Sequence, residues 1–116
     1  MLLQGHVKVY IARDRVDLRK SYDGLSLLVQ EVLREDPLSG HLFVFFNRRL
    51  DKVKVLYWDK NGFCLWQKRL EKGRFRVDAF QAPCWVMSLQ EFHLLLWGIT
   101  LKRLPASPSF QEYVVG

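Results

Sequence analysis

The feature that most restricts the fold is an Asn61-Gly62 pair between two segments rich in β-branched and aromatic residues. Asn-Gly is the strongest short-range hairpin signal, because both central residues of a type I′ turn need a positive φ. Residues 53–58 and 63–70 are therefore expected to pair as antiparallel strands, with Lys60 opposite Phe63. The middle of the chain is thus predicted to form a β-sheet.

Further strands and two helices are expected around this hairpin. Residues 7–11 alternate apolar and polar, residues 42–46 form an apolar run typical of a central strand, and residues 75–80 fit one more strand. A helix is expected from Asp17 or Ser21 as N-cap to near Glu35, and a second over residues 89–97, after a Ser88-Glu91 capping box and with Gly98 at its C-terminal cap. The predicted fold class is α+β: an antiparallel β-meander of about five strands with two packed helices.

The length and composition of the chain limit the class of protein to which it can belong. With 116 residues the chain makes one domain, expected over residues 1–104, followed by a loose tail over residues 105–116. Hydrophobic residues make up 49% and charged residues 26%, which excludes general disorder. The sequence has no run long enough for a membrane helix and no signal-peptide pattern, so we expect a cytoplasmic protein with Cys64 and Cys84 reduced. Its three histidines lack metal-ligand spacing, and we expect no metal, cofactor or small-molecule substrate.

The net charge of +6 is concentrated in the middle of the chain. Residues 48–76 contain ten basic and three acidic side chains, whereas the rest contains eight basic and nine acidic ones. A basic segment beside a nearly neutral remainder is the pattern expected of a surface for a polyanion. It indicates nucleic acid as a partner, with an acidic protein as the alternative.

The hairpin gives these cations two faces. Alternation places Lys54, Trp58 and Arg69 on one face, and Trp66 and Lys68 on the other. Aromatic rings among cations suit stacking on bases, so Trp58 and Trp66 are stacking candidates; the alternative is that both are core residues.

Arg48 and Arg49, at a turn tip, are the best phosphate candidates, since guanidiniums bind phosphate in forked geometry; simple solvation of a charged loop is the alternative. The full set of candidates for nucleic-acid binding is Arg48, Arg49, Lys52, Lys54, Lys68, Arg69, Lys72, Arg74, Arg19 and Lys20.

The sequence contains little that indicates catalysis. A nuclease or strand-transfer enzyme would need clustered carboxylates to hold metal ions, and the aspartates are scattered among predicted turns. No nucleophile, phosphate-loop or dinucleotide motif occurs. We therefore expect a protein that is not an enzyme.

An ordered set of motifs resembles one family of mobile-element proteins. The motifs are Asp-Leu-Arg-Lys-Ser-Tyr-Asp-Gly-Leu at 17–25, Ser-Gly-His-Leu-Phe-Val-Phe at 39–45, Asn-Arg-Arg at 47–49, Val-Leu-Tyr-Trp-Asp at 55–59, Gly-Phe-Cys-Leu-Trp at 62–66 and Lys-Arg-Leu-Glu-Lys-Gly-Arg-Phe at 68–75. This pattern resembles the TnpB accessory proteins, the second-open-reading-frame products, of insertion sequence family sixty-six. The resemblance implies a role in transposition beside a separate transposase, with DNA and that transposase as partners.

Two hypotheses follow. The first is an accessory protein that binds nucleic acid through the basic strip of residues 48–76. The second is a protein–protein adaptor that docks on the transposase without contacting DNA, anchored by apolar side chains outside the core such as Leu27 or Trp97.

Overall fold

The chain folds into one mixed β-sheet with helices on both faces. The structure is a computed structural model that describes residues 6–77 and 81–98. Its strands are β1 (Lys8–Ala12), β2 (Leu42–Phe46), β3 (Lys52–Asp59), β4 (Gly62–Arg69) and β5 (Cys84–Ser88); its helical segments are α1 (Tyr22–Leu28), the π-helical turn η1 (Val29–Leu33) that continues it, and α2 (Leu89–Leu96). The predicted α+β class with five strands and two packed helices is confirmed. The expected tail, residues 105–116, lies outside the described residues.

The strand order is β4-β3-β2-β1-β5. The β2–β3–β4 part is the predicted antiparallel meander, and β1 pairs antiparallel with β5. β1 and β2 pair in parallel, because α1 and η1 carry the chain from the end of β1 back to the start of β2. β2 lies in the middle of the sheet and all five of its residues are buried, as its apolar run predicts.

The fifth strand is not the one expected. Residues 75–77 form no strand and residues 78–80 lie outside the description, so the predicted strand at 75–80 is wrong over its described part. The strand is β5, where Trp85 and Met87 are buried and Val86 between them is exposed. The chain reaches the far edge of the sheet beside β1, because that edge offers unpaired backbone groups and an apolar face.

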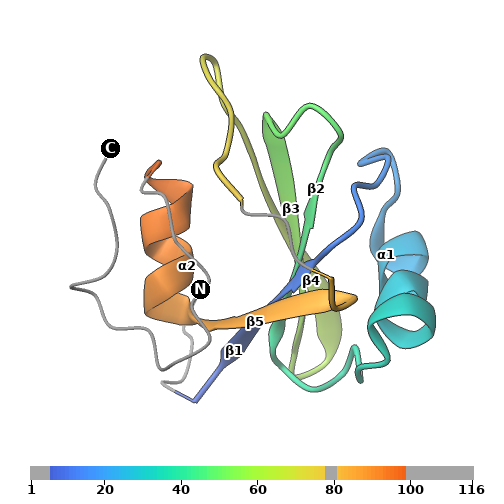
Figure 1. The fold of residues 1–116 in the computed structure, drawn as a ribbon. Helices are drawn as coiled ribbons and strands as arrows, with labels where there is room; N and C mark the ends of the chain where they lie inside the picture. The colour runs from blue at the N-terminus through green and yellow to red at the C-terminus, as the bar shows by residue number, and fades with distance from the viewer. Residues whose placement is uncertain (1–5, 78–80, 99–116) are drawn as a thin grey trace.

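Two apolar layers hold the fold together, one on each face of the sheet. Leu25, Val29 and Leu33 pack on Phe43 and Phe45 beneath α1 and η1. On the opposite face α2 places Phe92 and Leu95 against a second cluster that includes Ile11, Val44, Val55 and Phe75. The two helices therefore cover opposite sides of the sheet (Figure 1). No helix in the described ranges is long and apolar enough to cross a membrane.

The π-helical turn changes which residues of the first helix are buried. Ser21 takes the N-cap position, as expected, although its side chain makes no capping hydrogen bond. Leu25, Val29 and Leu33 are buried, whereas Val32, which lies seven residues after Leu25 and would share its face in a regular α-helix, is 41% exposed. The wider i→i+5 turn of η1 rotates Val32 towards solvent, and Arg34 ends it in the left-handed conformation.

The caps of α2 follow the sequence closely. The Ser88 hydroxyl accepts a hydrogen bond from the Glu91 backbone N–H at 3.1 Å. The Glu91 carboxylate in turn accepts from that hydroxyl at 3.1 Å, where the sequence predicted a bond from the Ser88 backbone N–H. Gly98 follows the helix with a φ of +88°, as expected for a C-terminal cap.

The hairpin faces are as predicted, but its register is shifted by two residues. Asp59 pairs with Gly62, and the turn residues are Lys60, with a φ of +55°, and Asn61. This register pairs Leu56 with Leu65 and sets Trp58 edge-on against Phe63 with their ring centroids 5.1 Å apart. Such cross-strand apolar pairs outweigh the local preference of Asn-Gly for the turn centre.

Candidate nucleic-acid interface

Three segments meet at the end of the sheet away from the hairpin turn and enclose a groove of about 800 Å³. They are the β1–α1 connection, the β2–β3 loop with the start of β3, and the end of β4. The residues that line it are 15–19, 47–49, 52–54, 67–69 and 71, and we call this site the basic groove. Its lining contains eight cationic side chains and two carboxylates. Charge of one sign is therefore gathered in a concave surface, where it attracts anions most strongly.

The β2–β3 loop presents Arg48 and Arg49, and Asn47 builds it. The Asn47 side-chain oxygen accepts from the backbone N–H groups of Asp51 at 3.1 Å and Lys52 at 3.0 Å. Its amide nitrogen donates to the Asp51 carboxylate at 2.6 Å, and this bond holds the pKa of that carboxyl below its usual range. The asparagine thus closes the loop on itself and leaves the two arginines at the tip.

Backbone hydrogen bonds from the β4–β5 connection tie the same loop down. The Leu70 N–H donates to the Asp51 carbonyl at 2.8 Å, and the Phe75 N–H donates to the Leu50 carbonyl at 2.7 Å. Leu50 adopts a φ of +58°, a conformation that a branched residue takes only where its surroundings impose it. The arginines therefore stand on a loop of fixed shape.

Arg15 and Lys54 add cations that are held in place by uncharged partners. The Arg15 guanidinium donates to the Arg13 carbonyl at 2.9 Å and lies 6.0 Å from the Phe46 ring centroid; its partial burial lowers its pKa. The Lys54 ammonium donates to the Lys20 carbonyl at 3.0 Å. Neither contact neutralises the charge, so both cations remain available to an anion.

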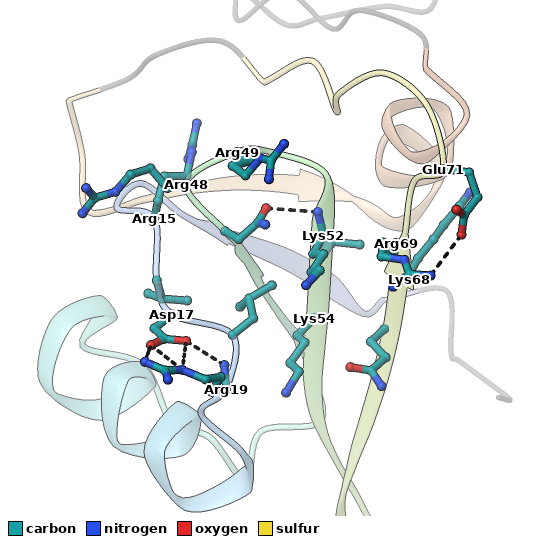
Figure 2. A pocket seen from close by; sticks show the side chains of 15 residues that line it. Arg15, Asp17, Arg19, Arg48, Arg49, Lys52, Lys54, Lys68, Arg69 and Glu71 are labelled. Carbon is teal, nitrogen blue, oxygen red and sulfur yellow. Dashed lines mark hydrogen bonds and ion pairs between the residues drawn. The ribbon is translucent and has the colours of Figure 1, made fainter.

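The two carboxylates of the groove are already paired. Asp17 accepts from the Arg19 guanidinium at 2.9 and 3.0 Å, and this pairing lowers the pKa of Asp17 to about 2. Glu71 accepts from Arg69 at 3.3 Å. Figure 2 shows the Asp17–Arg19 pair on one side of β3 and the Arg69–Glu71 pair on the other, with Lys54 between them and Arg15, Arg48 and Arg49 at the rim.

Seven of the ten candidate cations line the groove. They are Arg19, Arg48, Arg49, Lys52, Lys54, Lys68 and Arg69. Lys20, Lys72 and Arg74 are exposed but do not line it. Sequence reasoning did not single out Arg15, which lies in the charged connection after β1. Arg15 lies beside Phe46 because the neighbouring Val16 N–H donates a hydrogen bond to the Phe46 carbonyl at 3.0 Å. No sequence pattern predicts this contact.

Both stacking candidates lie outside the basic groove. Trp58 packs edge-on against Phe63 near the hairpin turn, and Trp66 is 37% exposed on the face of β4 that carries Lys68. Stacking by either tryptophan stays a prediction.

Within residues 6–77 and 81–98 there is no group of three or more His, Cys, Asp or Glu side chains placed to hold a metal ion. The groups of the basic groove that could bind an anion are its cationic side chains.

Comparison with known proteins gives the family. The model of the family described as "IS66 Orf2 like protein" matches residues 7–106, most of the chain. This chain belongs to the IS66 Orf2-like family. The match covers every described element, including the basic groove.

Two relatives of this IS66 Orf2-like chain come from Sinorhizobium fredii. The uncharacterized protein y4hO is 41% identical over 100 residues, which cover 85% of this chain and 87% of the relative. The uncharacterized protein y4jC is 35% identical over 102 residues, which cover 88% of this chain and 87% of the relative. No solved structure matches.

Proposed function

We propose that this chain is an accessory protein in the transposition of an IS66-type insertion element and that it binds nucleic acid through the basic groove. One observation carries the binding proposal: eight cations line the groove against two carboxylates, and each carboxylate is already paired with an arginine. Cations that form no ion pair within the protein can neutralise DNA phosphates and so release the counterions condensed on the DNA, and forked guanidiniums suit phosphate oxygens. Membership of the IS66 Orf2-like family supports the role in transposition.

The test compares two double variants that remove the same charge. Arg48→Ala/Arg49→Ala deletes cations of the groove, and Lys72→Ala/Arg74→Ala deletes two exposed cations that do not line it. Fluorescence anisotropy with labelled DNA from an element end measures affinity, and a transposition assay in cells measures function.

We expect the Arg48/Arg49 variant to weaken DNA binding at least tenfold and to reduce transposition, whereas the Lys72/Arg74 variant stays within about threefold of the parent, because single phosphate contacts at an exposed surface are weak. Equal losses in both variants would mean that overall charge, and not the groove, determines binding. Absence of DNA binding by the parent protein at low salt would exclude the binding proposal.

A second candidate function is an adaptor that docks on the transposase, and the exposed apolar side chains of one segment favour it. Among the residues that the structure describes, four of the seven exposed large apolar side chains, Tyr22, Leu27, Val32 and Leu38, come from one short segment over α1, η1 and the following turn. Between Ser21 and Gly40 the chain carries four acidic residues and one arginine. An apolar surface with acidic neighbours fits a basic partner with apolar anchors.

Co-purification with the transposase after nuclease treatment tests the adaptor. Leu27→Asp should abolish this co-purification while DNA affinity stays unchanged, because Leu27 is 54% exposed and lies outside the groove. Full retention of the transposase by this variant would exclude the surface as the docking site.

A further inference from the structure

Among the residues that the structure describes, none that lines the basic groove is aromatic, although this part of the chain is rich in aromatic residues. Proteins that hold single strands through their bases supply aromatic rings on which the bases stack. The apolar side chains that reach the groove, Val16, Leu18 and Val53, are aliphatic. A base entering the groove would therefore meet cations and small aliphatic groups but no ring.

The amide groups that could read base edges are also scarce. Asn47 lines the groove, but its oxygen and its nitrogen are both used to build the β2–β3 loop. Gln67 is the other amide in the lining. Reading a base pair needs an element that protrudes into a DNA groove, whereas these side chains line a hollow. A hollow surface is complementary to the convex sugar–phosphate backbone.

We propose that the basic groove takes a sugar–phosphate backbone and makes no stacking or sequence-reading contact with bases; this inference rests on the function proposed above. The backbone phosphates lie against Arg15, Arg48, Arg49, Lys52, Lys54 and Lys68, the cations of the groove that form no ion pair within the described ranges. The protein would hold DNA wherever the transposase delivers it, and the choice of sequence would belong to another component.

The test compares an oligothymidine strand with an abasic strand of the same length and phosphate number, using the full chain at low salt and fluorescence anisotropy. The proposal predicts affinities within about threefold of each other. Stacking is worth about 1–3 kcal/mol per base, so one or more stacked bases would make the oligothymidine at least about fivefold tighter and overturn the proposal.

Duplexes provide the second arm. Element-end DNA and a duplex of shuffled sequence should bind within about threefold, and a tenfold preference for the element end would contradict backbone-only contact. Trp66→Ala locates any stacking: a preference for oligothymidine that this substitution abolishes arises at Trp66, outside the groove, and only a preference that survives it overturns the proposal. Arg48→Ala/Arg49→Ala should weaken binding to all four ligands. Failure of every ligand to bind would overturn the proposed function itself, a result distinct from unequal binding.

Discussion

Replacing Asn47 by alanine tests how the shape of the β2–β3 loop affects DNA binding without changing the charge of the loop. The variant loses three side-chain hydrogen bonds, to the N–H groups of Asp51 and Lys52 and to the Asp51 carboxylate, and it removes no cation. Each such bond contributes about 0.5–1.5 kcal/mol net, and the loop is partly exposed, so we expect the free energy of unfolding to fall by about 2 kcal/mol. For a domain of this size that lowers Tm by roughly 8–15 °C.

The same variant should bind DNA at least about fivefold more weakly. Arg48 and Arg49 would then have to be ordered on binding, at about 0.5–1.5 kcal/mol for each immobilised side chain. The salt dependence of the affinity should not change, because the number of cations is unchanged. Urea unfolding measures the first effect and anisotropy at several salt concentrations measures the second.

A matched control changes charge without this loop chemistry. Arg48→Ala/Arg49→Ala should keep the stability within about 0.5 kcal/mol, as expected of exposed side chains, while lowering the steepness of the salt dependence. If Asn47→Ala instead leaves both stability and DNA affinity unchanged, the backbone bonds from Leu70 and Phe75 suffice to hold the loop, and the role assigned to Asn47 is wrong.

Three further outcomes follow from the same contacts. Asp17→Asn frees Arg19 and removes a carboxylate from the groove, so DNA affinity at low salt should rise about two- to fivefold; a weaker complex would contradict this pairing. In an NMR titration the Asp17 carboxyl should have its midpoint near pH 2, below the ordinary pKa of 3.8. The Asp17–Arg19 pair therefore stabilises the fold above about pH 4, and this stabilisation is lost as the pH falls towards 2. A midpoint near pH 4 would mean that the pair does not form. Phe75→Ala should cost about 3–5 kcal/mol in urea unfolding because the ring is buried against Phe46, and a loss below about 1 kcal/mol would show that this packing is absent.

The sequence predicts elements that are determined by local patterns. The faces of the hairpin, the central position of β2 and the caps of α2 all follow from periodicity and from side chains close in sequence. Contacts between segments that are far apart in the sequence cannot be predicted from such local patterns. The parallel pairing of β1 with β2 depends on where α1 and η1 return the chain, and the edge position of β5 depends on the free edge of β1. The hairpin register is likewise decided by Leu56 meeting Leu65 across the strands, and not by the turn residues alone.

The basic groove could likewise be predicted in part, where its residues are close together in the sequence. Charge density pointed to the β2–β3 loop and to the ends of β3 and β4, whose cations do meet in the groove. Arg15 could not be found, because its place depends on the β1–α1 connection running along the end of β2. Nor could the pairing of Asp17 with Arg19 be separated from helix capping, since an aspartate before a helix serves either purpose.

The salt dependence of DNA affinity tests most directly whether the groove presents its cations to phosphates. Six of its cations form no ion pair among the residues described, and four to six phosphate contacts give a slope of log affinity against log salt of about −4 to −5 on duplex DNA. We expect this slope for the parent protein and a slope shallower by about 2 for Arg48→Ala/Arg49→Ala. A slope near zero, or one that the double substitution does not change, would contradict this expectation.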